Sequence, residues 1–284
     1  MRMAIIIERI NRYAVKGLHA EPLQRVTLAT HQGLAHDRRF AIARGDTKLD
    51  ADRPRWLPKQ KLVMLMRDAE MARLAYQLDV DAGMITLRAP GAEPCTATFA
   101  TAAGRSQLEG YVNRFLGERR EGPARWIEAG AISFTDLPHN CVSLLNLESV
   151  RDLESRTGLS LDPRRFRANF LLQGAAPFAE FDWVGHEIGI GSVRLRIATR
   201  IPRCAATAVH PGTGERDVNV VQSLRRTYGH HDMGVYAEVV AGGSVAVADV
   251  VTPPRDPQRR SYFGHRLRFL SFLARSVPTV LRRR

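Results

Sequence analysis

The residues best suited to chemistry form the stretch Arg200-Ile201-Pro202-Arg203-Cys204. It closes a run in which apolar and polar residues alternate, so we expect Cys204 where a strand passes into a loop. The thiolate is the nucleophilic and metal-binding form of cysteine, and a guanidinium beside it favours that form. The pattern indicates a reactive thiol or a soft metal ligand, while redox sensing and simple burial stay open.

The other cysteines and the histidines give weaker signals. Cys95 and Cys141 are predicted to be small buried apolar residues. Three scattered cysteines are too few for a disulfide framework or a cysteine-rich metal site, which favours a reducing compartment. No spacing matches a metal-ligand motif among the candidate histidines His36, His139, His230 and His231.

The net charge of +13 comes from 42 lysines and arginines set against 29 aspartates and glutamates. Such an excess favours anionic partners, and part of it lies in the arginine-rich tail after residue 254. No basic groove interleaved with aromatic residues and no helix-turn-helix pattern is visible, so we expect no nucleic acid partner. No apolar run is long enough for a signal peptide or a membrane span, which predicts a cytoplasmic protein.

A hydrophobic content of 44% in 284 residues predicts a globular protein with one large or two medium domains. Many short strands, glycine-rich turns and few helices favour a mainly β, barrel-like fold over a doubly wound sheet. The predicted helices span 63–75 (where 62–66 also fits a strand), 106–116, 146–156 and 220–228, and 44–58 is predicted as a loop. The predicted strands span 4–13, 24–30, 38–42, 77–80, 84–89, 141–145, 170–172, 193–197, 234–240 and 244–251, and 188–191 leads into the strand at 193–197.

Seven short fragments follow one another along the chain, and the fourth is the pair Arg203-Cys204. They span 166–169, 178–183, 189–191, 203–204, 210–214, 234–236 and 248–251. Together they resemble the MOSC domain, which is named after the C-terminal part of molybdenum cofactor sulfurase. Upstream, 13–17 and 33–40 are similar to the β-barrel domain that precedes MOSC in the mitochondrial amidoxime-reducing component and its bacterial relatives. The resemblance covers about residues 3–252.

The resemblance implies an N-terminal MOSC-type β-barrel domain at 1–125, a MOSC β-barrel domain at 126–252 and a basic tail at 253–284. It implies a molybdenum cofactor, Mo-molybdopterin, bound between the two domains. Pyridoxal phosphate binding is a further association of the family. These implications concern the family as a whole and are expectations for this chain.

Particular residues match the family's motifs. The resemblance implies that Cys204 ligates molybdenum and is the catalytic residue. Soft thiolate sulfur suits such a metal, and arginine and lysine suit a phosphate. The implied cofactor contacts are Arg203, Arg167 and Asn169 at the pterin, and Lys16 and Arg38 at the phosphate.

The activity that the resemblance implies is reduction of small N-hydroxylated or N-oxide-type substrates. Electrons would come from separate proteins, a flavin reductase and a heme or iron–sulfur carrier, because the chain has no four-cysteine cluster. Two alternatives stay open. The protein could be a sulfur carrier with a Cys204 persulfide, or a cofactor-binding module without turnover.

Three positions depart from the family pattern. Gly17 stands where relatives often have serine, Pro202 replaces a polar residue before the Arg-Cys pair, and Ala168 replaces a proline. The metal ligand is retained, while the residues that shape the cofactor contacts differ. Candidates for positioning a substrate are Asp136, His139 and Asn140, just ahead of the predicted strand at 141–145.

The C-terminal tail has the pattern of a basic amphipathic helix over 261–281. Its apolar stripe is flanked by arginines, so two interpretations have equal weight. The helix could lie on the inner membrane surface, or it could pack on its own domain. The stripe consists of Phe263, Leu267, Leu270, Leu273 and Val277.

Overall fold

The computed structural model describes residues 4–49, 55–118 and 121–255, so the predicted tail helix and its membrane contact lie outside the described residues. The strands are β1 (Ile6–Arg12), β2 (Glu21–Leu23), β3 (Arg25–Leu28), β4 (Phe40–Ala43), β5 (Ala75–Asp79), β6 (Met84–Arg88), β7 (Cys95–Thr98), β8 (Arg125–Glu128), β9 (Val142–Asn146), β10 (Phe170–Gln173), β11 (Glu187–Ile190), β12 (Val193–Pro202), β13 (Asp232–Ala241), β14 (Gly243–Ala246) and β15 (Val251–Thr252). The α-helices are α1 (Ala102–Leu116), α2 (Leu147–Thr157) and α3 (Val220–Tyr228). Short 3₁₀ helices are η1 (Lys59–Lys61), η2 (Ala69–Arg73), η3 (Pro163–Phe166), η4 (Ala179–Phe181) and η5 (Ala205–Ala208). The predicted mainly β fold is confirmed.

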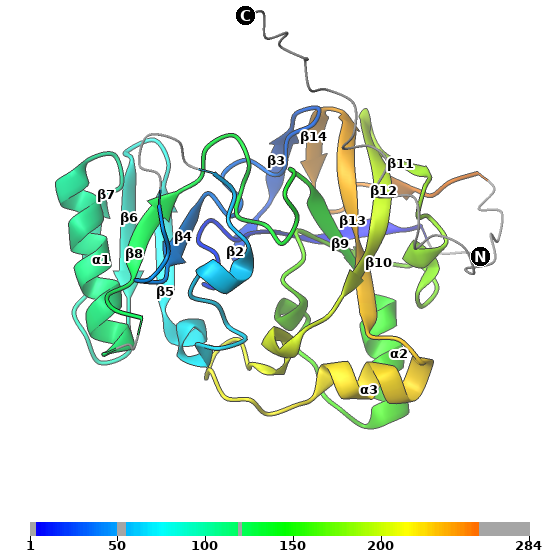
Figure 1. The fold of residues 1–284 in the computed structure, drawn as a ribbon. Coiled ribbons are helices and arrows are strands. Elements are labelled where there is room, and N and C mark those ends of the chain that lie inside the picture. Colours follow the sequence, from blue (N-terminus) through cyan, green and yellow to red (C-terminus); the bar gives the residue numbers. More distant parts are fainter. Residues whose placement is uncertain (1–3, 50–54, 119–120, 256–284) are drawn as a thin grey trace, which may run out of the picture.

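The largest sheet has the strand order β15-β11-β12-β13-β9-β10-β1-β2 (Figure 1). Its pairings are antiparallel except that of β9 with β10, which is parallel. β1 lies beside β10, and β3 pairs with β14. Strands from the start of the chain therefore complete a sheet that is built mostly from residues after 140. The division into domains at residue 125 stays a prediction.

A smaller layer contains the sheet β5-β6-β7 and the helix α1, which pack together at one end of the molecule (Figure 1). The ladder β4-β8 lies next to them. Phe40 on β4 and Trp126 on β8 share the buried core of this layer with Leu108 and Val112 of α1. The strands β7 and β8 were not expected from the sequence.

Burial follows the sequence pattern in the main sheet. On β12, Val193, Leu195 and Ile197 are buried while Arg194 and Arg196 are exposed, which confirms the predicted alternation. The strand β9 is instead buried throughout, because it has a core on each face. One core lies within the curved main sheet, and the other lies between the sheet and the helices α2 and α3.

The predicted helices at 146–156 and 220–228 are confirmed as α2 and α3. Asn146 and Asn219 cap their first turns by accepting backbone N–H groups. Gly158 and Gly229 end them in the left-handed conformation that favours glycine. The helix predicted at 106–116 is also confirmed, although α1 begins earlier, at Ala102.

The helix predicted at 63–75 is wrong. Only η2 forms within that range, because the carboxylate of Asp68 accepts the Met64 N–H at 3.0 Å and turns the chain. Val63 is extended instead, and its N–H donates to Ile42 O on β4 at 2.8 Å. The apolar residues are buried as a helix would bury them, so their spacing alone did not distinguish the two structures.

Among the described residues, no helix has both the length and the apolar character needed to cross a bilayer.

A fully buried carboxyl group joins η4 to the start of α2. Glu180 accepts from Asn146 Nδ2 at 3.2 Å and from Ser149 Oγ at 3.1 Å, and Ser149 Oγ in turn accepts the Phe178 N–H at 2.8 Å. Burial raises the pKa of Glu180 to about 7, and the hydrogen bonds oppose this shift only in part.

We predict that Glu180 makes the free energy of unfolding fall as pH rises. Between the ordinary pKa of 4.5 and about 7 the unfolded chain releases this proton while the folded chain keeps it, so unfolding becomes easier. Urea unfolding at pH 4.5 and 7.5 should show wild type losing up to about 3 kcal/mol relative to Glu180→Gln. The exposed Glu8→Gln variant is the control. Parallel pH profiles for wild type and Glu180→Gln would contradict the prediction.

Candidate functional site

Cys204 lies directly after β12, where the strand passes into η5, as the sequence predicts. Its carbonyl oxygen accepts from the Thr207 N–H at 3.1 Å and from Thr207 Oγ1 at 2.9 Å, which fixes the turn behind the thiol. The side chain is partly exposed and lines a cavity of about 120 Å³. A cavity of this size holds several water molecules and is open to a ligand.

All six site residues predicted from the sequence lie in the wall of this one cavity. They come from distant parts of the chain, because the segment after β1 and the segment before β4 meet the loops around η3 and the end of β12. The six are Lys16, Arg38, Arg167, Asn169, Arg203 and Cys204.

Positive charge dominates the wall. Lys59 and Arg165 join the four predicted cations, and the carboxylate in the lining belongs to Asp136. Fields of one sign add up inside a cavity with low-dielectric walls. The cavity therefore suits an anionic ligand.

Arg203 is held by backbone carbonyls. Its Nε donates to Met233 O at 2.7 Å, its Nη1 donates to Phe166 O at 2.8 Å, and its Nη2 also contacts Met233 O. Burial lowers the pKa of Arg203 to about 10. The guanidinium thus connects the beginning of β13 to η3 immediately beside the thiol of Cys204.

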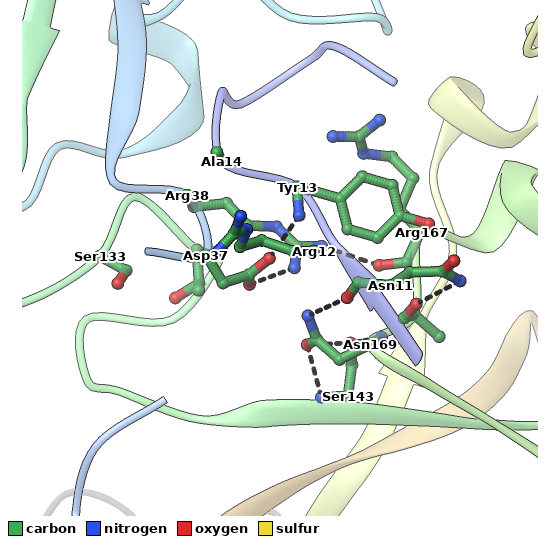
Figure 2. Close-up of polar contacts among 12 residues, drawn as sticks. Asn11, Arg12, Tyr13, Ala14, Asp37, Arg38, Ser133, Ser143, Arg167 and Asn169 are labelled. Atoms are coloured by element: carbon green, nitrogen blue, oxygen red, sulfur yellow. Dashed lines mark hydrogen bonds and ion pairs between the residues drawn. The ribbon is translucent and has the colours of Figure 1, made fainter. Parts of the chain in front are cut away.

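Arg38 and Arg167 both stack against the ring of Tyr13, at 4.5 and 4.4 Å from its centroid. Figure 2 shows these residues together with Asp37, which pairs with Arg38. Arg38 Nη2 donates to Arg167 O at 2.7 Å, and Arg167 Nη1 donates to Leu18 O at 2.7 Å. These contacts join the segment after β1 to the loop that follows η3.

The two arginines differ in their charge balance. Burial disfavours the charge of Arg38, but Asp37 outweighs this and raises its pKa. Burial and then the neighbouring Arg38 lower the pKa of Arg167 to about 10. Arg167 and Arg203 have no carboxylate partner among the residues that the structure describes.

Lys16 is held by a carbonyl and a carboxylate. Its Nζ donates to Phe134 O and to Asp136 Oδ1, each at 2.7 Å, and Lys59 lies 3.5 Å from Asp136. Burial lowers the pKa of Lys16, which Asp136 opposes. Burial would raise the pKa of Asp136, yet Lys16 and Lys59 outweigh it and bring that pKa well below the ordinary value. Asp136 is therefore a carboxylate at neutral pH.

Asn169 uses its side-chain amide within the protein (Figure 2). Its Oδ1 accepts from Ser143 N at 3.0 Å and from Ser143 Oγ at 2.9 Å, and its Nδ2 donates to Asn11 O at 3.2 Å. These bonds connect β9, β10 and β1 in the floor of the cavity. Its predicted contact with a pterin stays a prediction.

Other lining residues were not identified from the sequence. Lys59 lies in a segment without a recognisable motif, and Arg165 belongs to a basic run that resembles a solvated face. Cys141 also lines the cavity and is buried as predicted, with a pKa raised to about 12 by burial. Cys95 is only partly buried, because β7 is the edge of its sheet. Only the folding of the chain brings Lys59, Arg165 and Cys141 into the wall of the cavity.

The substrate-positioning candidates separate in the structure. Asp136 lines the cavity, whereas Asn140 donates to Gln32 Oε1 at 3.3 Å and to Ala131 O at 3.0 Å. Among the described residues, no three His, Cys, Asp or Glu side chains gather closely enough to hold a metal ion.

Comparison with protein families gives two matches. The MOSC domain model matches residues 93–252, and the MOSC N-terminal beta barrel domain model matches residues 4–127. The first match covers more than half of the chain. The two matched ranges overlap over residues 93–127, which include β7, α1 and most of β8.

Curated relatives match over part of the chain. The molybdenum cofactor sulfurase of Drosophila willistoni is 31% identical over 33% of this chain and 12% of its own length. Mitochondrial amidoxime reducing component 2 is 30% identical in Bos taurus, over 39% of this chain and 36% of the relative. The Homo sapiens form is also 30% identical, over 40% of this chain and 37% of the relative. The matched region thus spans well under half of each relative's length.

Two crystal structures are similar in part. YiiM from Geobacillus stearothermophilus is 17% identical with a TM-score of 0.32, over 40% of this chain and 53% of that chain. The YUAD protein from Bacillus subtilis is 11% identical with a TM-score of 0.40, over 88% of this chain and 96% of that chain.

We predict that Gly234→Ala destabilises the protein and displaces Arg203. Gly234 has φ +74°, and an added Cβ would clash with Leu144 O and lie 3.1 Å from Arg203 Nη2. Gly191→Ala is a matched control, since Gly191 has φ +56° but no atom within 4 Å of the added Cβ. Urea unfolding should show a loss of at least about 2 kcal/mol for Gly234→Ala and a smaller loss for the control. Equal losses would show that the close approach of Arg203 and Leu144 has no effect.

Proposed function

The chain belongs to the MOSC domain family, and we propose that it is a molybdenum-cofactor-dependent oxidoreductase acting on small N-hydroxylated or N-oxide-type compounds. Its similarity to amidoxime reducing components and to molybdenum cofactor sulfurase supports a link to that cofactor.

Two buried guanidinium groups without carboxylate partners in the described structure share the cavity wall with the thiol of Cys204. A buried charge without a counter-charge is costly, and an anion bound between Arg167 and Arg203 would offset that cost. The cavity thus combines a soft metal ligand with a site for an anion. A pterin that carries both a metal and a phosphate suits this combination.

The residues of the chain have distinct roles in this proposal. Cys204 holds the metal through its thiolate, and Arg203 orients the segment that carries the thiol. Arg167 and Arg38 face the anionic ligand. Lys16 contributes positive charge near the phosphate. Its ion pair with Asp136 offsets part of that charge and holds the ammonium group in place. Tyr236 lines the cavity as a neutral phenol, and burial raises its pKa further above neutral pH.

When bound, the cofactor supplies transfer of an oxygen atom together with two electrons. The overall reduction takes two electrons and two protons per N–OH group and releases the oxygen as water, leaving the N–H compound. The electrons come from separate proteins, a flavin reductase and a heme or iron–sulfur carrier. Similarity to proteins called amidoxime reducing components supports this division of labour.

A second candidate is a sulfur carrier. The partial exposure of Cys204 in a cationic cavity would favour a persulfide at that position, and one relative is named molybdenum cofactor sulfurase. This candidate requires the thiol but no bound metal. Analysis of molybdenum, pterin and persulfide in the purified protein separates the two.

We predict that wild type retains stoichiometric molybdenum and pterin, and that Cys204→Ala loses the molybdenum together with reductase activity, because the thiolate is the protein's metal ligand. Elemental analysis, pterin fluorescence and reduction of a model amidoxime measure these properties. Cys95→Ala is the control, since Cys95 lies far from the cavity on β7.

If Cys204→Ala keeps both its molybdenum and its activity, the assignment of Cys204 fails. A persulfide on wild type without metal would favour the sulfur carrier, and bound cofactor without reductase activity would favour a binding module.

A further inference from the structure

A larger, open hollow of about 710 Å³ adjoins the cavity. The two spaces share Arg203, Cys204 and Thr207 in their walls. The volume of the hollow lies in the range of sites that bind small molecules, about 300–1,000 Å³. A ligand that fills the cavity therefore leaves a second space beside Cys204, which is the residue proposed to hold the metal.

The hollow lies between η5 and the first part of α3, two elements that pack together. Val221 and Arg225 line it one helical turn apart, so both lie on the same side of α3. Val218, just ahead of the helix, and Ala205 on η5 add small apolar side chains to the wall. The hollow thus combines an apolar lining with a cation on the helix.

Positive charge in this lining is not balanced by the protein. The carboxylate in the wall belongs to Asp217, which already pairs with Arg165 at 2.6 Å. Arg216 donates to a neutral partner, the carbonyl of Met66, at 2.9 Å. Arg225 is exposed, and its side chain forms no hydrogen bond or ion pair with the residues that the structure describes. The charge of the hollow therefore complements an anionic group on a ligand.

We propose that the hollow is the substrate site and that it selects N-hydroxylated compounds that carry a carboxylate. The N–OH group lies at the Cys204 end, the apolar body lies against Val221, and the carboxylate pairs with Arg225. A guanidinium group suits this role because it offers two parallel N–H donors to a carboxylate. This inference rests on the proposed reductase function and adds the chemical class of its substrate.

Arg225→Gln tests the proposal by calorimetric titration of the purified protein. The two ligands are para-carboxybenzamidoxime and benzamidoxime, which differ only in the carboxylate. We expect wild type to bind the carboxylated compound about three- to fivefold more tightly, and Arg225→Gln to bind the two equally. Arg225 is exposed on α3 and glutamine is a comparable helix former, so the variant should fold.

Arg226→Gln is the matched control. Arg226 is the next residue of α3 and is also exposed, but it lies outside the lining of the hollow. Both variants lose one positive charge, so a general effect of net charge would be the same in each. The preference for the carboxylated compound should survive in Arg226→Gln and shrink as ionic strength rises. Failure of that compound to bind wild type, or an equal change in the two variants, would overturn the proposal.

Turnover separates a failure of this inference from a failure of the reductase function. Reduced methyl viologen supplies electrons to the cofactor-loaded protein, so no carrier protein is needed. If the carboxylated compound binds through Arg225 but is not reduced, the binding site is supported and the reductase function fails. If both amidoximes are reduced, with the same ratio of their kcat/KM values in wild type and in Arg225→Gln, the reductase function stands and the proposed selection in the hollow is wrong.

Discussion

The guanidinium groups of Arg167 and Arg203 are buried in one cavity wall without a carboxylate beside them in the described structure. Withdrawing such charges from water costs several kcal/mol per ion, so the fold must hold them by other means. Neutral backbone groups hold the two guanidinium groups in place. The carbonyl of Leu18 accepts from Arg167, and the carbonyls of Phe166 and Met233 accept from Arg203. Burial still lowers both pKa values, which leaves the wall suited to an anion.

Maintaining that wall requires segments from distant parts of the chain to meet. Arg38 and Arg167 both stack on the Tyr13 ring. Beneath them, Asn169 connects β9, β10 and β1. The antiparallel pairing of β1 with β10 brings the loop before β10 to the same edge as the end of β1. The contacts of Asn169 that underlie the cations thus also join neighbouring strands of the main sheet.

Sequence reasoning succeeded where a local pattern decides the outcome. The alternation on β12 predicted the strand and the position of Cys204 at its end, and helical spacing predicted α2 and α3. It failed at 63–75, where a carboxylate of Asp68 and a bridge to β4 prevent a helix that the apolar spacing allows. Lys59 and Arg165 were missed for a similar reason, because nothing local separates a cavity lysine or arginine from a solvated one.

The sequence by itself determined the mainly β class, the family resemblance and six residues that share one cavity wall. These features depend on the types of residue and on their order over short stretches, both of which can be read from the sequence. The tertiary structure decided how each of them is used. It commits the amide of Asn169 to Ser143 and Asn11, pairs Lys16 with Asp136, and leaves Arg167 uncompensated. Partner, burial and charge balance are set by residues far away in sequence, so only the folded chain could fix them.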